Sequence, residues 1–335
     1  MRVFDLHCDT IDSLCMADEA RFLPYLSERP SGDIRSNNLA LATERMSAAA
    51  QGGWCQCYAI WVPDDLMGLG LSQRAFYERA CAYFKGQMEA HPHDVSQVLS
   101  ATDIDKALGA GRVAALLAVE GASPVQEDLS YLDRMHEDGV RMVTLCWNGK
   151  NSIASGNDTT DGISAFGREA VRHMLELGMV VDVSHLNDQG FSDLLALTDA
   201  PFVASHSNSR SVCGHPRNLT DDQFRAIVAR GGLVGLNYYR GFITERLGHG
   251  HEAVGAQDEV SFDELAAHVE HFLDLGGEDV LALGSDYDGS TVPTWLDGSQ
   301  TMGGFWQLMR ARFGQETCQK IFFDNARRFF GRQLG

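Results

Sequence analysis

Positive charge is scarce in this sequence: its 335 residues include 27 lysines and arginines against 46 aspartates and glutamates, a formal net charge of −19 at pH 7. A protein that neutralises nucleic-acid phosphates needs a basic surface, so this balance excludes an ordinary nucleic-acid binder. Hydrophobic residues still make up 44% of the chain and charged residues 22%, which is the balance of a globular protein with a large core. We therefore expect a folded protein that has no nucleic-acid partner.

Long apolar runs and closely spaced cysteines are also missing. No segment approaches the roughly 20 apolar residues that span a bilayer. The first residues, MRVFDLHCDT, contain neither the basic nor the apolar stretch of a secretion signal. The eight cysteines are scattered, unlike those of a small disulfide-rich domain. These absences predict a cytoplasmic protein with reduced thiols and no membrane anchor.

The sequence does contain a repeated alternation of short apolar runs with longer segments of helical period. Continuous apolar runs are typical of parallel strands that helices cover on both faces. Eight such runs occur, at 3–6, 54–61, 113–119, 141–146, 179–183, 202–204, 233–236 and 280–283, and the helical patterns between them include 73–90, 165–177, 221–229 and 262–275. Eight strand-then-helix repeats predict an α/β fold, the (β/α)8 TIM barrel.

The connection after the first predicted strand is unusually long. Residues 8 to about 52 exceed what a simple crossover needs, so we expect extra short elements there, over the barrel mouth. No internal repeat, low-complexity tract or linker-like shift in composition marks a boundary within the chain. The sequence therefore predicts one barrel domain over residues 1–335.

Residues of metal-ligand type recur where the predicted strands end, which is where barrel enzymes place their catalytic groups. Five of the eight strand ends carry them: His7 and Asp9, Glu120, His185, His206, and Asp286. In the His7-Cys8-Asp9 segment, the spacing of an extended chain points the two outer side chains to one side. Each residue alone has an ordinary structural explanation. Together, however, charges gathered at one rim repel one another and lose hydration unless cations are present.

The number of ligands favours two metal ions. Three imidazoles and two or three carboxylates exceed the three protein ligands of a typical catalytic zinc. Two ions about 3.5 to 4 Å apart, bridged by a carboxylate and a hydroxide, would use all of them. Imidazole and carboxylate without thiolate suit zinc, although manganese, cobalt and iron accept the same ligands. We therefore expect a binuclear centre with Zn2+ as the first choice.

Several motifs of this chain, in this order, match those of a known family. They are HCDT (7–10), AVEGA (118–122), VDVSH (181–185), SHSNSRSVCGHPRNL (205–219), NYY (237–239), GSDYDG (284–289) and DNARRFF (324–330). With them the sequence resembles the membrane (renal) dipeptidase family, peptidase family M19, including its soluble bacterial members. The resemblance covers essentially the whole chain. It implies a (β/α)8 barrel that hydrolyses dipeptides at a binuclear zinc site.

The resemblance also implies which residues hold the two zinc ions. His7, Asp9 and Glu120 match the ligands of the first ion, and Glu120, His185 and His206 match those of the second. Glu120 would then bridge the ions, together with a water or hydroxide. That hydroxide would attack the peptide carbonyl, because metal coordination lowers the pKa of water towards about 7.

Further matches concern the substrate. Asp286 matches the acidic group beside the bridging water, where it would relay a proton to the leaving amine and contact the substrate. Arg217 matches the family's ligand for the terminal carboxylate of the dipeptide, a role that suits a guanidinium fork. His215 and Asp288 are assigned supporting roles. Members of the family tolerate a D-residue at the carboxyl end of the dipeptide, and the resemblance extends this expectation to the present chain.

One position departs from the family pattern. Family members carry a histidine after the fourth strand, where it contacts the substrate and stabilises the oxyanion, whereas this chain reads TLCWN (144–148) and has Trp147 there. An indole donates one hydrogen bond but carries no proton. Oxyanion stabilisation then falls to zinc, to Asn148 or to a loop donor. Trp147 either alters the specificity or only reshapes a pocket wall.

Two other functions stay open on the sequence alone. An amidohydrolase of another branch would act on a cyclic amide, a lactone or an N-acyl amino acid and would use a carboxylated lysine, for which Lys150 is the candidate. Such barrels typically open with HxH, whereas this chain has HxD. The second alternative is a binding protein that keeps the metals but has lost turnover, as Trp147 suggests. The expected partners are a small dipeptide substrate and, by resemblance only, a second copy in a homodimer.

Overall fold

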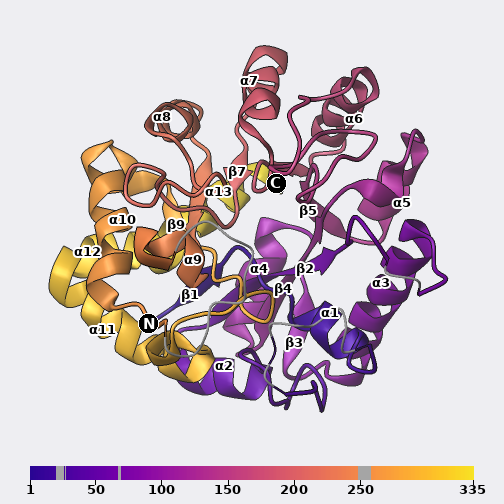
Figure 1. Cartoon of the computed structure of the whole chain (residues 1–335). Coiled ribbons are helices and arrows are strands. Elements are labelled where there is room, and N and C mark those ends of the chain that lie inside the picture. The colour runs from indigo at the N-terminus through magenta and orange to yellow at the C-terminus, as the bar shows by residue number, and fades with distance from the viewer. Residues whose placement is uncertain (20–25, 27, 67–68, 248–257) are drawn as a thin grey trace.

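Parallel strands form a closed ring with helices around it in the computed structural model, which describes residues 1–19, 26, 28–66, 69–247 and 258–335 (Figure 1). The strands are β1 (Val3–Asp5), β2 (Trp54–Trp61), β3 (Val95–Gln97), β4 (Val113–Glu120), β5 (Val140–Thr144), β6 (Val180–Asp182), β7 (Val203–Ala204), β8 (Leu233–Leu236) and β9 (Leu281–Leu283). They pair in the order β2-β1-β9-β8-β7-β6-β5-β4, and pairing of β2 with β4 closes an eight-stranded barrel. The predicted (β/α)8 barrel and its eight strands are confirmed.

Strand β3 lies outside the barrel and was not predicted. It pairs with the beginning of β4, from Val95 opposite Val113 to Gln97 opposite Ala115. On the same edge of β4, β5 pairs only from Leu117 onward. Since β2 occupies the other edge along the whole of β4, β3 fills the part of the edge that β5 leaves free. A strand of three residues is too short for its pattern of apolar residues to be recognised in the sequence.

Helices follow the strands and form the outer layer. They are α1 (Thr10–Cys15), α2 (Thr43–Ala49), α3 (Gln73–Ala90), α4 (Ala101–Gly109), α5 (Ser130–Glu137), α6 (Ala165–Glu176), α7 (Asp188–Leu197), α8 (Asp221–Ala229), α9 (Arg240–Ile243), α10 (Phe262–Asp274), α11 (Met302–Phe313), α12 (Gln315–Gln319) and α13 (Asn325–Gln333). The predicted helices 73–90 and 221–229 match α3 and α8 at both ends. Those at 165–177 and 262–275 overshoot α6 and α10 by one residue. Helices α1 and α2 occupy the long connection after β1, as expected.

Alternate residues of the strands separate two hydrophobic layers. On β4, Ala114, Leu116 and Ala118 belong to an inner cluster, while the residues between them pack outward against the helices. The inner cluster also contains the phenylalanines of α13, and Phe330 stacks on Phe4 of β1 at 5.2 Å between ring centroids. Helix α13 therefore closes the end of the barrel where the strands begin, which leaves the carboxyl ends of the strands for the site.

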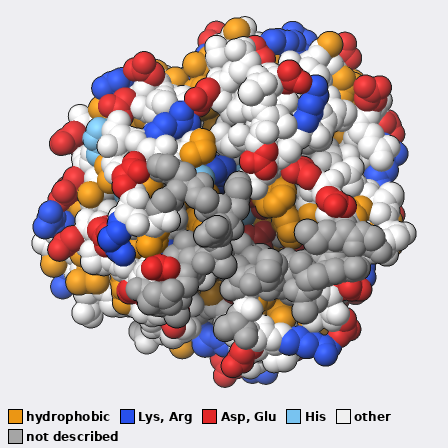
Figure 2. All heavy atoms as spheres, viewed as in Figure 1, with side chains coloured by type: hydrophobic (Ala, Val, Ile, Leu, Met, Phe, Trp, Pro, Cys, Tyr) orange, Lys and Arg blue, Asp and Glu red, His pale blue; other side chains and the backbone are white. Residues whose placement is uncertain are grey.

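One face of the molecule shows how its acidic residues are distributed (Figure 2). Seen from the side of Figure 1, aspartates and glutamates are spread over the face rather than gathered in one patch (Figure 2). Within the described residues, no helix combines the length and the apolar character that crossing a bilayer requires.

Candidate metal centre and active site

The predicted metal ligands meet at the carboxyl end of the barrel, although they come from different strands. His7 and Asp9 follow β1, Glu120 ends β4, and His185 and His206 follow β6 and β7; each of the five is at most 8% exposed. Asp286 follows β9 and joins them. Ligand atoms of His7, Glu120 and His206 lie within 4.8 Å of one another, and so do those of His7, Asp9 and Asp286. His7 takes part in both groups.

Glu120 lies between two sets of histidines. Its Oε1 atom is 2.7 Å from Nε2 of His185 and 3.5 Å from Nε2 of His206. Its other oxygen, Oε2, is 3.5 Å from Nε2 of His7, and that nitrogen is 3.4 Å from Oδ2 of Asp9. The two oxygens of one carboxylate thus face different ligand sets, which is the arrangement that a bridging ligand needs.

Two buried polar atoms of this cluster have no hydrogen-bond partner among the described residues. They are Nε2 of His7 and Oδ1 of Asp9. A buried polar atom without a partner is costly, and such atoms are rare in folded proteins unless water or an ion satisfies them. The donor set of imidazole nitrogens and carboxylate oxygens suits a divalent transition ion. The residues present therefore fit the metals that the sequence predicted.

The pKa values of the clustered side chains are shifted in the way expected of a site that binds a cation. Burial alone would raise the pKa of Glu120, but the charges of His7 and His185 lower it well below its usual value. Burial opposes protonation of His7, yet Glu120 and Asp9 raise its pKa well above its usual value. Burial, with the charge of Arg217 adding to it, lowers the pKa of His185 to about 4. The carboxylates thus hold a proton on His7 that a metal ion would replace.

The backbone is adapted to bring these side chains inward. Gly121 has a φ of +90°, which turns the chain directly after Glu120. His185 and Asp286 have φ values of +72° and +60°, in the left-handed region that costs non-glycine residues about 1–2 kcal/mol. Such strain persists only where the surrounding structure enforces it, and it is concentrated at functional sites.

Asn148, a candidate oxyanion donor, and Asp288, a predicted supporting residue, tie these loops together. Oδ1 of Asn148 lies 2.8 Å from Nδ1 of His185, so the Asn148 side chain orients that imidazole. The Asp288 carboxylate accepts hydrogen bonds from Oγ1 of Thr10, at 2.6 Å, and from the backbone N of Ala40, at 2.7 Å. Because Thr10 directly follows Asp9, Asp288 fixes the loop after β9 to the loop after β1.

Arg217 is the candidate anchor for a substrate carboxylate. It is 5% exposed, and its Nε and Nη2 atoms have no hydrogen-bond partner among the described residues. The guanidinium lies over the ring of Phe242, with 5.3 Å from Cζ to the ring centroid. A buried cation with free N–H groups is costly unless an anion binds it, so this side chain points to a negatively charged group of a ligand.

Trp147 forms part of an aromatic wall beside the metal ligands. Its ring lies edge-on to that of Trp61, with centroids 5.1 Å apart, and its centroid is 6.1 Å from that of His185. Trp61 ends β2 and was not among the predicted site residues. Its position as the last residue of a predicted strand is the signal that could have identified it.

Asn237 is a second residue that the sequence analysis did not assign. Its Nδ2 atom donates to Oδ2 of Asp286, at 3.1 Å, and to the backbone O of His206, at 3.3 Å. It follows β8 directly, as the other site residues follow their strands. Asn237 therefore sets the distance between the loops after β7 and β9.

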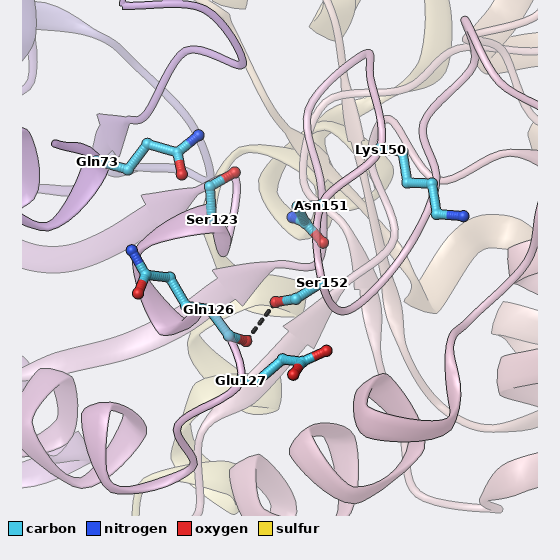
Figure 3. Close-up of a pocket in the computed structure, with 7 residues that line it drawn as sticks. All are labelled: Gln73, Ser123, Gln126, Glu127, Lys150, Asn151 and Ser152. Carbon is cyan, nitrogen blue, oxygen red and sulfur yellow. Dashed lines mark hydrogen bonds between the residues drawn. The ribbon is translucent and has the colours of Figure 1, made fainter.

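Lys150, the candidate for a carboxylated lysine, does not lie with the ligands. It lines a polar cavity of about 220 Å³ together with Gln73, Ser123, Gln126, Glu127, Asn151 and Ser152 (Figure 3). Its Nζ atom lies 2.5 Å from Oδ2 of Asp161, and its side chain is 54% exposed. An exposed lysine paired with an aspartate offers no bridging ligand to the buried cluster.

Comparison with known proteins agrees with this geometry. Residues 1–333 match the family described as membrane dipeptidase (peptidase family M19). An uncharacterized protein in the pqqA 5′ region of Klebsiella pneumoniae is 32% identical over 274 residues, which are 79% of this chain and 96% of that protein. An uncharacterized dipeptidase of Schizosaccharomyces pombe is 34% identical over 205 residues, 59% of this chain and 47% of that protein. A metallopeptidase of Rhodobacter sphaeroides, solved with a phosphinate mimic of the dipeptide L-Ala-D-Ala, superposes with a TM-score of 0.84 at 26% identity, covering 99% of each chain.

Proposed function

Since the chain belongs to the membrane dipeptidase family, peptidase family M19, we propose that it hydrolyses dipeptides at a centre of two zinc ions. His7, Asp9 and Glu120 would hold one ion, and Glu120, His185 and His206 the other. The observation that carries this proposal is the position of Glu120, whose two oxygens face His7 on one side and His185 with His206 on the other.

The unpartnered N–H groups of Arg217 support a substrate with a free carboxylate. A dipeptide offers this carboxylate close to its only peptide bond, so anchoring the carboxylate limits where that bond can lie. Burial lowers the pKa of His185 to about 4 and the charge of Arg217 adds to this shift, which supports a guanidinium near the metal ligands. The Rhodobacter sphaeroides enzyme with its L-Ala-D-Ala mimic supports the same substrate class, including a D-residue at the carboxyl end.

Asp286 is positioned to handle the proton of the reaction. Burial raises its pKa to about 7, and the negative charges of Asp9 and Glu120 contribute to the rise. Asn237 holds Oδ2, so the carboxylate keeps a fixed orientation with Oδ1 towards the loop after β1. When bound, zinc supplies Lewis acidity and lowers the pKa of a coordinated water. Cations nearby also lower the pKa of Asp286, which favours the carboxylate as a proton acceptor and, later, as the donor to the leaving amine.

The test is turnover of a dipeptide panel by the purified protein supplied with Zn2+. We expect release of free amino acids from L,L and L,D dipeptides, and no release from tripeptides blocked at the carboxyl end. Binding of dipeptides without release would indicate instead a protein that keeps the metals but has lost turnover. Hydrolysis of cyclic amides, lactones or N-acyl amino acids in preference to dipeptides would contradict the proposal.

Replacing Glu120 by Gln tests the bridging role. An amide has one oxygen and cannot supply a charged ligand atom to each of two ions, so the E120Q variant should lose most of its bound zinc and its activity. Metal analysis of the purified variant measures this directly. A variant that retains two zinc ions per chain would contradict the bridge.

A further inference from the structure

Two buried aspartates make the same connection between neighbouring strands. Asp5 lies opposite Leu283, and Asp182 lies opposite Val203. In each case the carboxylate accepts two hydrogen bonds from the serine two residues beyond its strand partner. Ser285 donates its N to Oδ1 of Asp5 at 2.8 Å and its Oγ to Oδ2 at 2.5 Å.

Ser205 repeats this pattern with Asp182. Its N donates to Oδ1 of Asp182 at 2.9 Å, and its Oγ donates to Oδ2 at 2.6 Å. Asp182 is fully buried and also accepts from Oγ1 of Thr144, at 2.6 Å, and from N of Ser184, at 3.0 Å. Four donors thus hold this carboxylate, and its orientation is fixed from three segments of the barrel.

The two serines differ in what else their hydroxyls contact. Oγ of Ser205 lies 2.8 Å from Nδ1 of His206, whereas Oγ of Ser285 contacts the backbone O of His7 at 3.0 Å and, among the described residues, no imidazole. A serine hydroxyl has one hydrogen. Because Ser205 donates that hydrogen to Asp182, its oxygen accepts from Nδ1 of His206, and the imidazole carries its proton on Nδ1. Nε2 of His206 then has a free lone pair, and it is the atom that faces Glu120.

We propose that Ser205 and Asp182 are positioning residues for metal binding: through the Ser205 hydroxyl, Asp182 fixes the tautomer of His206 and strengthens Nε2 as a metal ligand. The proposal rests on the metal site of the proposed function. It also distinguishes His185 from His206 by the group that each Nδ1 contacts. His185 donates its Nδ1 proton to the neutral amide of Asn148, whereas His206 is connected to a carboxylate. Partners of this kind behind a histidine ligand are worth about 10- to 100-fold in metal affinity.

The experiment measures Zn2+ affinity of the full chain after metal removal, by competition with a chromophoric chelator and without any substrate. Ser205→Ala removes the hydroxyl between His206 and Asp182, and Ser205→Thr restores a hydroxyl. Ser285→Ala is the matched control, because it removes the same serine-to-aspartate connection where no imidazole depends on it. We expect S205A to bind the ion that Glu120, His185 and His206 would hold about 10- to 100-fold less tightly, and S205T and S285A to stay within a few-fold of the parent.

A second readout separates positioning from general loosening. In the metal-free protein, the 15N chemical shifts of the histidines report which ring nitrogen is protonated. We expect one imidazole to move from the Nδ1-protonated form to a mixture in S205A and to stay unchanged in S285A. Unchanged zinc affinity in S205A, or an equal loss in S205A and S285A, would overturn the proposal. Since no measurement uses a peptide, failure of the dipeptidase assignment would leave the result intact.

Discussion

The indole of Trp147 packs edge-on against that of Trp61, with ring centroids 5.1 Å apart, and the Trp147 ring also lies beside His185. Aromatic surface next to a catalytic centre favours apolar substrate groups, and one such contact is worth about tenfold in specificity. We expect Trp147→Ala to lower kcat/KM about tenfold for dipeptides that contain phenylalanine, with a smaller effect on glycine-containing dipeptides. The measurement is kcat/KM for a set with glycine or phenylalanine at either position. An unchanged ratio between the two would show that the wall does not select the substrate.

Arg217 is expected to act through the substrate's carboxylate. The Arg217→Lys variant keeps the positive charge but loses the planar fork of donors, so KM for free dipeptides should rise about tenfold or more while kcat changes less. The comparison is between dipeptides and the same compounds amidated at the carboxyl end. A KM that rises equally for both would exclude carboxylate anchoring.

Gly289 allows the loop after β9 to approach Asp9. A Cβ atom added there would lie 1.9 Å from Oδ2 of Asp9 and 2.8 Å from Oδ1 of Asp286, so Gly289→Ala must displace one of these side chains. We expect zinc affinity and activity to fall at least tenfold. Gly303→Ala in α11 is the control: the added methyl meets nothing within 4 Å and should stabilise the helix by about 0.5–1 kcal/mol. Parent-like zinc binding by G289A would show that the loop relaxes without cost.

His268 makes stability sensitive to acid away from the metal site. It is fully buried, its Nδ1 accepts from N of Ser209 at 3.0 Å, and its Nε2 donates to O of Ile243 at 2.9 Å. Burial lowers its pKa to about 4. The unfolded chain therefore binds a proton below pH 6.5 that the folded chain binds only near pH 4. The contribution of His268 to the free energy of unfolding is fully present above pH 6.5. It is lost as the pH falls from 6.5 to 4, which lowers the free energy of unfolding by roughly 3 kcal/mol.

The His268→Gln variant tests this contribution. Glutamine can accept and donate as the neutral imidazole does but does not titrate, so the free energy of unfolding of H268Q should fall less steeply between pH 6.5 and pH 4. Urea unfolding at several pH values measures the difference. Parallel pH profiles of the variant and the parent would assign the acid sensitivity to other groups.

Local sequence patterns were enough to predict the barrel and the types of ligand at its mouth. Apolar runs and helical periods are local properties, so β2, α3 and α8 could be predicted to the residue, and residues such as His7 and Glu120 could be placed at strand ends. The order of strands then follows from the way parallel strands connect through helices. The three-residue strand β3 escaped because its pairing depends on a free stretch of the β4 edge rather than on its own pattern.

The contacts between the side chains of the site, by contrast, could be seen only in the folded chain. Strand register and loop shape set these contacts. They determine which oxygen of Glu120 faces which histidine and bring the Asn237 amide to Asp286. They also place the Ser205 hydroxyl between His206 and Asp182. Residues of the same types stand at Asp5 and Ser285, where the same connection touches no imidazole in the part of the chain that the structure describes. A hydrogen bond requires its atoms to meet within a few tenths of an ångström, and only closure of the barrel brings segments so distant in the sequence to that precision.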